Sequence, residues 1–437
     1  MTYSDAIQFL YSLRWFGAKF GLHNTLRLAE LAGNPQQRLR FIHVAGTNGK
    51  GSTCAMLESI YRAAGLRVGL FTSPHLVAFG ERIQINRKPI PKADVLKLAA
   101  EIQPLLKEFS SEEHPTFFEV VTVMALQYFA SRECDLVVWE TGLGGRLDAT
   151  NIVTPLASII TNIQYDHQKW LGETLTSIAA EKAGIIKAGV SVITGTDAPE
   201  ALQVIATAAR DHGAPLTVVS PGAMHQPPLD SIRLPLLGQH QRMNAAVALA
   251  TVRVLESQLP VAVEVIRSAL NRVRWAGRLQ LVTRPSGQRV LLDGAHNIGG
   301  AEALGAALRE YFPDARPALV LGILRDKDWS AMCALLAPLA SRILLVPVHS
   351  ERTAEPHGLA EVCRSANPDA PVTEHDSLGS ALGDAATEPF VTIAGSLYLI
   401  GEAMELLHVS PAKAPHERAL NEWGGVPVVR TPATAGP

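Results

Sequence analysis

From about Arg40 onward, short runs of β-branched residues alternate with amphipathic, alanine-rich stretches. This alternation is typical of a parallel sheet whose two faces are covered by helices. The apolar runs begin with FIHVAG and RVGLFTS, which flank the helical stretch KGSTCAMLESIYRAAG, and continue with DLVVWE, LASIITN and VSVITG. Because ligands of open α/β sheets gather at the carboxyl ends of the strands, we expect the functional residues in the loops that follow these runs.

A second α/β series begins after about Arg278, with RVLLDGAHN and then the helical stretch GAEALGAALREYF. The segment between the two series, RVRWAGRLQLV, predicts a hinge, and 437 residues exceed the usual size of one core. We therefore predict a larger parallel-sheet domain over residues 1–275 and a smaller, Rossmann-like α/β domain over residues 276–410. Residues 411–437 are rich in Pro and Ala with little periodicity, which predicts a disordered tail.

Composition narrows the possible partners. Lys plus Arg (39) nearly balances Asp plus Glu (41), so the chain has no broad basic field for a nucleic acid. The four cysteines are isolated in sequence, which argues against a zinc site or a disulfide framework and favours a reducing compartment. The N-terminus lacks the basic start of a signal peptide, and no apolar run has the length of a membrane span. We expect a cytoplasmic monomer that acts on small molecules, without nucleic acid or membrane partners.

The strongest local signal is FIHVAGTNGKGST, in which an apolar run enters a glycine-rich loop before a helix. Glycines let backbone N–H groups close around phosphate oxygens, the helix N-terminus adds partial positive charge, and Lys50 adds a full charge. The spacing departs from the common G-x-x-x-x-G-K-[ST] form, because Val44 and Gly51 replace a glycine and a hydroxyl residue. A tight βα turn is the alternative, but the strand and helix around the loop favour a P-loop ATPase domain. The predicted phosphate-binding residues are Gly46, Thr47, Asn48, Gly49, Lys50, Gly51 and Ser52.

Three further residues follow apolar runs and could hold a nucleotide-bound Mg²⁺: Ser73, Glu140 and His167. Mg²⁺ prefers hard oxygen ligands, so a carboxylate and a hydroxyl are expected, whereas an imidazole is less typical. Singly, a loop serine or histidine is more often a cap or a solvated side chain. Glu140 ends the apolar run LVVW, and burying its carboxylate there costs free energy unless a cation compensates the charge. That cation could be a metal ion or, as the alternative, the guanidinium of Arg146 in a salt bridge. Lys182 alone resembles a helix-surface lysine.

Together these residues resemble the folylpolyglutamate synthase and dihydrofolate synthase family, part of the Mur ligase superfamily. The matching motifs occur in order between Gly46 and Leu399, and ETGLGGRLDATN and DGAHN are much more specific than the phosphate loop. The motifs are GTNGKGS, FTSPHL with ERIQIN, TFFEVVTVMAL, ETGLGGRLDATN, the DH of QYDHQKW, EKAGIIK, GQHQRMNAAVAL, GRL, LLDGAHN and AGSLYL.

The resemblance implies a role for each candidate residue. Ser73, Glu140 and His167 would surround Mg²⁺, and a carbamylated Lys182 would supply an oxygen ligand to a second metal ion. Asn244 would contact the nucleotide base. Arg278 and Asp293 would reach ATP from the hinge and the second domain, with His296 nearby. ATP would then lie between the domains, so chemistry would begin only when both domains supply their ligands.

The implied reaction joins glutamate to a folate-type carboxylate, and the residues suit it. A carboxylate must be activated before an amine attacks it, and γ-phosphoryl transfer gives an acyl-phosphate, for which Lys50, Ser52 and Mg²⁺ supply charge neutralisation. His296 or Asp293 could remove the amine proton, although a capping or hinge contact is the alternative for His296. The segment Phe117–Glu119 reads equally as the pterin side of the cleft and as a buried helix face.

Two other functions compete with this prediction. A cell-wall Mur ligase shares the chemistry but binds a nucleotide-linked muropeptide, and TSPHL and GGRLDATN favour folate instead. A P-loop nucleotide switch would not need the DGAHN and GRL motifs of the second domain. Dihydrofolate synthase and folylpolyglutamate synthase activities use the same catalytic parts. Because Asp148 is compatible with pteroate binding, a bifunctional enzyme is expected.

Overall fold

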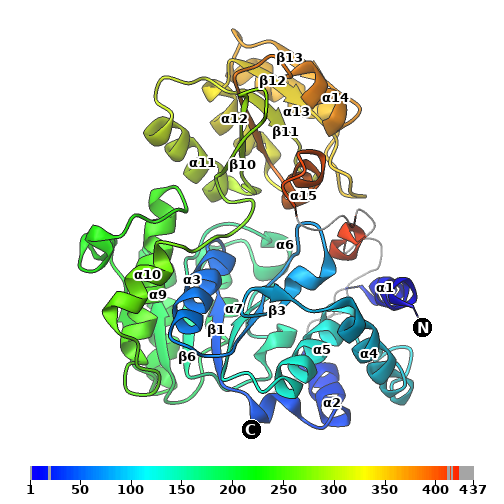
Figure 1. Cartoon of the computed structure of the whole chain (residues 1–437), viewed down its shortest axis with the longest axis vertical. Coiled ribbons are helices and arrows are strands. Elements are labelled where there is room, and N and C mark those ends of the chain that lie inside the picture. The colour runs from blue at the N-terminus through cyan, green and yellow to red at the C-terminus, as the bar shows by residue number, and fades with distance from the viewer. Residues whose placement is uncertain (1, 18–20, 411–413, 415–416, 423–437) are drawn as a thin grey trace.

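The two series of apolar runs form two separate sheets, stacked along the long axis of the molecule (Figure 1). The computed structural model describes residues 2–17, 21–410, 414 and 417–422. We refer to α1 through α10 as the N-terminal domain and to β9 through α15 as the C-terminal domain. Residues 271–279 connect α10 of the N-terminal domain to β9 of the C-terminal domain.

The N-terminal sheet has eight strands in the order β4-β3-β2-β5-β1-β6-β7-β8. The six neighbouring strands β2, β5, β1, β6, β7 and β8 pair in parallel. At one edge of the sheet, β3 pairs antiparallel with β2, and β4 pairs antiparallel with β3. Because Val44 of β1 pairs with Glu140 of β5, the loops after these two strands leave the sheet at the same edge. The strands are β1 (Phe41–Ala45), β2 (Val68–Phe71), β3 (Ile83–Ile85), β4 (Lys88–Pro89), β5 (Leu136–Glu140), β6 (Ala157–Ile160), β7 (Ser191–Thr194) and β8 (Leu216–Val218).

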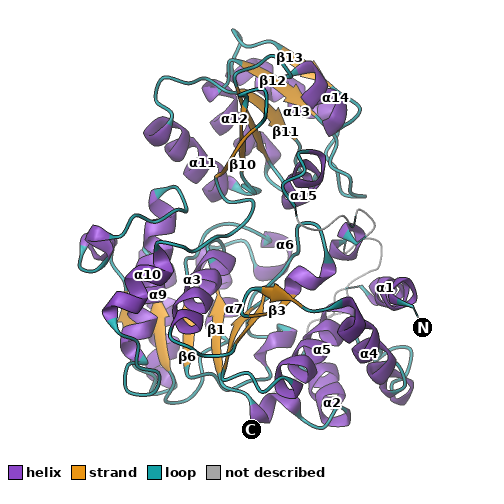
Figure 2. Ribbon diagram, viewed as in Figure 1, coloured by secondary structure: helices purple, strands orange, loops and turns teal. Residues whose placement is uncertain are grey.

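Helices cover both faces of this sheet (Figure 2). Alternate residues of a strand point to opposite faces, so Ile42 and Val44 pack with α3, α9 and α10, whereas Phe41 packs on the other side. There Trp139 is fully buried, with its ring 4.4 Å from that of Phe71 and 5.6 Å from that of Phe41. The helices are α1 (Tyr3–Ser12), α2 (His23–Leu31), α3 (Lys50–Ala63), α4 (Lys92–Ile102), α5 (Phe117–Ser131), α6 (Gln168–Leu171), α7 (Leu175–Ala183), α8 (Pro199–Asp211), α9 (Gln239–Val254) and α10 (Val263–Leu270).

The C-terminal sheet has six strands in the order β13-β12-β11-β14-β10-β9, of which only β9 is antiparallel to its neighbour. One face packs on α11, α12 and α13, and the other on α14 and α15. The strands are β9 (Gln280–Thr283), β10 (Arg289–Leu292), β11 (Ala318–Leu321), β12 (Arg342–Leu345), β13 (Val372–Glu374) and β14 (Phe390–Ala394). The helices are α11 (Ile298–Tyr311), α12 (Trp329–Leu336), α13 (Pro356–Ala366), α14 (Leu378–Asp384) and α15 (Leu397–Leu406).

Part of the predicted tail packs against the rest of the protein. Residues 417–422 contain a 3-10 turn, η9 (Arg418–Asn421), and Leu420, Asn421 and Glu422 are buried. The prediction of disorder is wrong for these six residues, because polar contacts with distant side chains hold them and no local periodicity reveals such contacts. The rest of 411–437, apart from Ala414, lies outside the described residues.

The predicted fold class is confirmed: two α/β domains carry mainly parallel sheets, and a glycine-rich loop joins β1 to α3. Within the described part of the chain, no helix combines the length and the apolarity needed to cross a bilayer.

Candidate active site

The glycine-rich loop turns sharply between β1 and α3, and two of its glycines are required by geometry. Gly49, the N-cap of α3, has φ +82°, and a Cβ there would overlap the Oδ1 atom of Asn244. Gly46 has φ +146°, and a Cβ there would overlap the hydroxyl of Thr161. Any larger residue would therefore force the loop away from its neighbours.

The loop is held by hydrogen bonds that leave its concave side facing a cavity. The amide of Asn48 donates to Asn162 Oδ1 (2.8 Å), and the hydroxyl of Thr161 donates to the carbonyl of Asn48 (2.6 Å). The ammonium of Lys50 folds back over the loop, donating to the carbonyls of Gly46 (3.1 Å) and Thr47 (3.2 Å). A helix N-terminus and a lysine thus point at the same space, which suits an anionic phosphate.

Lys182 is buried, which corrects the reading of it as a helix-surface lysine. It lies on α7 with 4% of its surface exposed, and its Nζ donates to the Gly46 carbonyl at 2.8 Å. Burial and the neighbouring charge of Lys50 lower the pKa of Lys182 to about 7. A substantial fraction of this amine is therefore unprotonated and nucleophilic at neutral pH.

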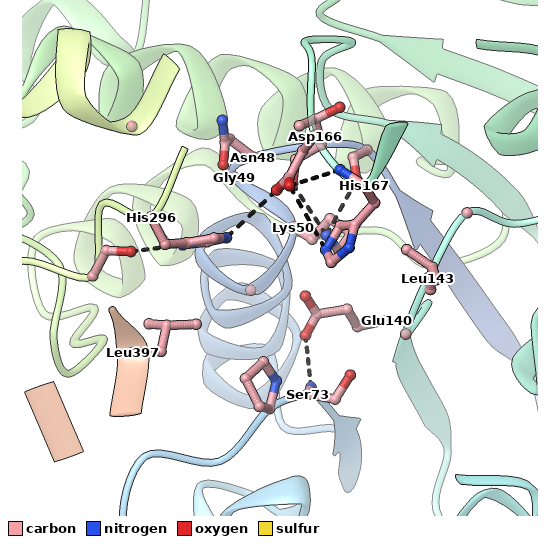
Figure 3. Close-up of a pocket in the computed structure, with 18 of the residues that line it drawn as sticks. Asn48, Gly49, Lys50, Ser73, Glu140, Leu143, Asp166, His167, His296 and Leu397 are labelled. Atoms are coloured by element: carbon pink, nitrogen blue, oxygen red, sulfur yellow. Dashed lines mark hydrogen bonds and ion pairs between the residues drawn. The ribbon is translucent and has the colours of Figure 1, made fainter. Parts of the chain in front are cut away.

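Glu140 ends β5 inside the protein, with 4% of its surface exposed. Its Oε2 accepts a hydrogen bond from the backbone N–H of Ser73 at 3.1 Å, and Figure 3 shows the carboxylate between Ser73 and His167. Burial raises the pKa of Glu140 to about 7, although the charge of Lys50 opposes this shift. Arg146 instead pairs with Glu181 at 2.8 Å, so the alternative salt bridge to Glu140 does not form.

His167 lies beside a charged cluster that joins the two domains (Figure 3). Its neighbour Asp166 accepts a hydrogen bond from Lys327 Nζ of the C-terminal domain at 2.5 Å, and His296 Nε2 lies 3.7 Å from the other Asp166 oxygen. Burial and the charge of Lys327 lower the pKa of His167 to about 3, so its imidazole is neutral at physiological pH. Neutral imidazole nitrogen is the form that binds metal ions.

His296 and Asp293 are fixed by backbone contacts at the start of the C-terminal domain. The two Asp293 oxygens accept from the N–H groups of Leu279 (2.8 Å) and Ala295 (2.9 Å). His296 Nδ1 lies 2.7 Å from the Gly294 carbonyl; a carbonyl only accepts, so Nδ1 carries the proton and Nε2 is the free base. Burial and Lys327 lower the pKa of His296 to about 4. The cap of α11 is Asn297, not His296.

A single cavity of about 500 Å³ is lined by both domains and contains every candidate site residue predicted from sequence. These are Gly46, Thr47, Asn48, Gly49, Lys50, Gly51, Ser52, Ser73, Glu140, His167, Lys182, Asn244, Arg278, Asp293 and His296. Their proximity is a property of the fold, whereas their individual roles stay predictions.

For Phe117–Glu119 at the start of α5, the sequence allows either a part of the cleft wall or a buried helix face, and the structure combines the two. All three residues line the cavity, while Val120 and the apolar residues after it are buried in the core. Glu119 and Thr116 form a capping box at the start of α5, in which Glu119 Oε2 accepts a hydrogen bond from the backbone N–H of Thr116 at 2.7 Å. Asp148 also lines the cavity and accepts from the N–H of Leu143 at 2.8 Å.

Sequence reasoning missed several charged cavity residues, among them Lys327, Arg82 and Arg352. No motif marks Lys327 or Arg352, because single charged residues in loops are usually solvated, whereas Arg82 lies within the ERIQIN motif, which does not single it out. Their only signal is three-dimensional: each approaches the cavity from a segment distant in sequence from the phosphate loop.

The donor set suits Mg²⁺ only in part. Among the described residues, no three or more His, Cys, Asp and Glu side chains are grouped as a metal site. Ser73, Glu140 and His167 offer one carboxylate, one hydroxyl and one neutral imidazole. Because Mg²⁺ usually keeps water and takes phosphate oxygens as ligands, such a partial set fits an ion that arrives with a nucleotide.

Comparisons with known proteins identify the family of the chain. Residues 44–252 match the Mur ligase middle domain, and residues 277–397 match the Mur ligase glutamate ligase domain. The chain is 35% identical to the dihydrofolate synthase/folylpolyglutamate synthase of Bacillus subtilis, over 93% of this chain and 99% of the relative.

Solved structures extend the likeness to three dimensions. The chain resembles Mycobacterium tuberculosis folylpolyglutamate synthase complexed with ADP, with a TM-score of 0.84, 29% identity, and coverage of 94% of this chain and 100% of the other. It also resembles Escherichia coli FolC in complex with DHPP and ADP, with a TM-score of 0.82, 32% identity, and coverage of 94% and 98%. The chain therefore belongs to the dihydrofolate synthase/folylpolyglutamate synthase family of ATP-dependent Mur-type ligases.

Proposed function

We propose that this protein adds L-glutamate to the carboxylate of dihydropteroate and of tetrahydrofolate polyglutamates, at the expense of ATP and through an acyl-phosphate. The observation that carries the proposal is the single cavity, to which both domains contribute the residues expected to bind nucleotide. Related structures hold ADP, and one of them holds DHPP as well.

In this proposal ATP lies between the domains. Its phosphates rest on the loop from Gly46 to Ser52, Asn244 contacts the base, and Arg278 and Asp293 reach the nucleotide from the hinge and the C-terminal domain. The position of Asn244 against Gly49 supports this assignment, since it places an amide beside the phosphate loop.

Ser73, Glu140 and His167 would hold the Mg²⁺ that enters with ATP, and that ion would supply charge neutralisation at the phosphates. The buried, high-pKa carboxylate of Glu140 supports this role, because a cation would offset the cost of burying its charge. We further propose that Lys182 reacts with CO₂ to become a carbamate, which would serve a second metal ion. The lowered pKa of Lys182 supports this step, since carbamate formation needs the free amine.

The protein's own groups then serve two transfers. The acceptor carboxylate oxygen attacks the γ-phosphorus and ADP leaves, with Lys50 and Ser52 positioned to neutralise the transferring group. The glutamate nitrogen next attacks the acyl carbon, phosphate leaves, and the nitrogen loses a proton. His296 Nε2 is the candidate base, because His296 lines the cavity and its lowered pKa of about 4 keeps the imidazole neutral at physiological pH. Closure around the intermediate would exclude water.

The test measures release of ADP and phosphate by purified protein with Mg²⁺ and glutamate, using dihydropteroate, tetrahydrofolate or a muropeptide as acceptor. A glutamate-sized mass gain on both folate acceptors supports the bifunctional assignment, and a gain on one restricts it. Turnover only with the muropeptide, or indifferent to every acceptor, would contradict the proposal.

We also propose that the protein is a monomer and acts in the cytoplasm. The four buried free cysteines support a reducing compartment.

A further inference from the structure

Residues 417–422, which we call the C-terminal segment, cross from one domain to the other along the cavity wall. Glu417 anchors the segment to the N-terminal domain: its carboxylate accepts from the hydroxyl of Tyr3 (3.1 Å) and from the N–H of Phe79 (2.7 Å). On the other side, the hydroxyl of Tyr398 donates to the carbonyl of Asn421 at 2.6 Å. The segment therefore has a defined position in the folded protein.

The end of the C-terminal segment meets three arginines that line the cavity. Arg82 donates to the Asn421 side-chain oxygen, and Arg14 Nε donates to the Glu422 carbonyl at 3.0 Å. Glu422 Oε2 lies 3.5 Å from Arg352 Nε. Asn421, Glu422 and all three arginines line the same cavity as the phosphate loop, so the segment places oxygen atoms on the cationic wall of the candidate active site.

Arg352 is held ready for an anion by other contacts. Its Nη1 pairs with Asp326 at 3.2 Å and its Nη2 donates to the Tyr398 hydroxyl at 3.0 Å. These contacts fix the guanidinium plane and turn its Nε edge toward Glu422. A guanidinium positioned in this way needs little further ordering to accept a carboxylate.

The carboxylate of Glu422 interacts only weakly with the Nε edge of Arg352. The residue is 6% exposed, and within the described part of the chain neither of its carboxylate oxygens accepts a hydrogen bond. A buried carboxylate without hydrogen bonds is costly, and its 3.5 Å separation from Arg352 Nε exceeds the length of a charge-assisted bond, about 2.7–2.9 Å. A carboxylate that is free to orient itself would bind this edge better than Glu422 does.

We propose that Arg352 and Arg14 form a subsite for a carboxylate of the ligand, and that Glu422 occupies this subsite in the free protein. The identity of the ligand rests on the proposed function: the glutamyl tail of a folate acceptor carries such carboxylates. The C-terminal segment then competes with the acidic tail. If the subsite is open for only about a tenth to a fifth of the time, the apparent affinity for the tail falls about 5- to 10-fold.

The first test compares binding of pteroyltriglutamate, without ATP, to the full-length protein and to Glu422→Gln, followed by tryptophan fluorescence. The neutral amide keeps the shape but loses the attraction to Arg352, so we expect about 5- to 10-fold tighter binding. The matched control is Glu388→Gln, because Glu388 lies 3.9 Å from Arg342 Nη1 and outside the cavity. Unchanged or weaker binding by Glu422→Gln would overturn the proposal and leave the segment a purely structural wall.

The second test asks whether a ligand displaces the segment. Hydrogen exchange of residues 417–422 is followed in the intact protein while a γ-linked triglutamate peptide is added. Faster exchange with the peptide supports displacement, and unchanged exchange at millimolar peptide overturns it. Neither measurement needs catalysis: if both succeed while glutamate-dependent phosphate release is absent, the proposed function fails and the carboxylate subsite stands.

Discussion

Lys327 Nζ of the C-terminal domain lies 2.5 Å from Asp166 Oδ1 of the N-terminal domain, and each side chain is only 7% exposed. Asp166 also accepts a hydrogen bond from the Asn297 side chain at 2.9 Å, and Asn297 in turn contacts Asn48 of the phosphate loop at 3.1 Å. A buried, charged contact between the domains is thus linked to the candidate nucleotide site through two hydrogen bonds.

We expect Lys327→Ala to destabilise the protein by about 3 kcal/mol, because it leaves the buried Asp166 carboxylate without its cation. Urea unfolding of Lys327→Ala, Asp166→Asn and the double variant measures the effect. The double variant should be less destabilised than the sum of the two single changes, since the neutral amide introduced by Asp166→Asn no longer needs a cation. Strictly additive losses would show that the two residues do not stabilise each other.

The same ion pair has a pH signature. Burial alone would raise the pKa of Asp166, but His167, Lys327 and His296 together hold it well below its usual value. A carboxyl with a depressed folded pKa contributes stability above its unfolded pKa of about 4 and loses it as the pH falls further. The stability difference between the wild type and Asp166→Asn should therefore be constant near neutrality and shrink below about pH 4. Urea unfolding between pH 7 and acid conditions measures it.

Gly49→Ala should abolish nucleotide binding. The new Cβ would overlap Asn244 Oδ1 at a residue with φ +82°, so the loop must shift away from the position that suits phosphate. Gly65→Ala is the matched control, because Gly65 has φ +94° but nothing within 4 Å of the added Cβ. Both variants should lose about 1 kcal/mol to backbone strain, and only Gly49→Ala should lose ADP binding in calorimetry. Equal ADP affinities would contradict the phosphate-loop assignment.

Local pattern predicted the phosphate loop well and the interdomain contacts poorly. The glycines and the flanking apolar run placed the loop between β1 and α3, because turn geometry and periodicity are written in adjacent residues. Glu140 was predicted for the same reason, as a carboxylate ending a buried strand. Local pattern alone makes Lys182 a helix-surface lysine, and only the family resemblance places it in the site, because its burial depends on the contact of its Nζ with the distant Gly46 carbonyl.

Lys327 and Glu422 had no local signal at all. Lys327 sits among charged residues in a loop, and Glu422 in a segment without periodicity, so each resembles a solvated residue in sequence. What buries them is packing between segments far apart in the chain: Lys327 against Asp166, and Glu422 against Arg352. Such long-range pairs become visible only in the folded structure.

Lys182 should form a carbamate, because its lowered pKa leaves a free amine at neutral pH. A ¹³C-bicarbonate solution should give a carbamate resonance in the ¹³C spectrum of the wild type that is absent from Lys182→Met. Lys187→Met is the control, because Lys187 is a partly buried lysine outside the cavity. The same resonance in Lys182→Met would exclude this site.

Glu140→Gln should make the protein more stable and less active. Burial raises the folded pKa of Glu140 to about 7 from 4.5, so the folded state above that pH must hold an unfavourable buried charge that the amide removes. The contribution of this carboxyl is favourable below its unfolded pKa and is lost as the pH rises through about 7. In EDTA at pH 8, the variant should therefore gain about 3 kcal/mol in urea unfolding, and the gain should fade toward about pH 4.5.

The control for this gain in stability is Glu181→Gln. Glu181 forms a partly exposed ion pair with Arg146, so this substitution should change the free energy of unfolding little. Added Mg²⁺ and ADP should stabilise the wild type more than Glu140→Gln, because a cation offsets the charge only where a carboxylate is present. If Glu140→Gln is less stable than the wild type in EDTA at pH 8, the prediction fails. Glu140 would then stabilise the fold as a hydrogen-bond acceptor for Ser73, and its charge would not destabilise the metal-free protein.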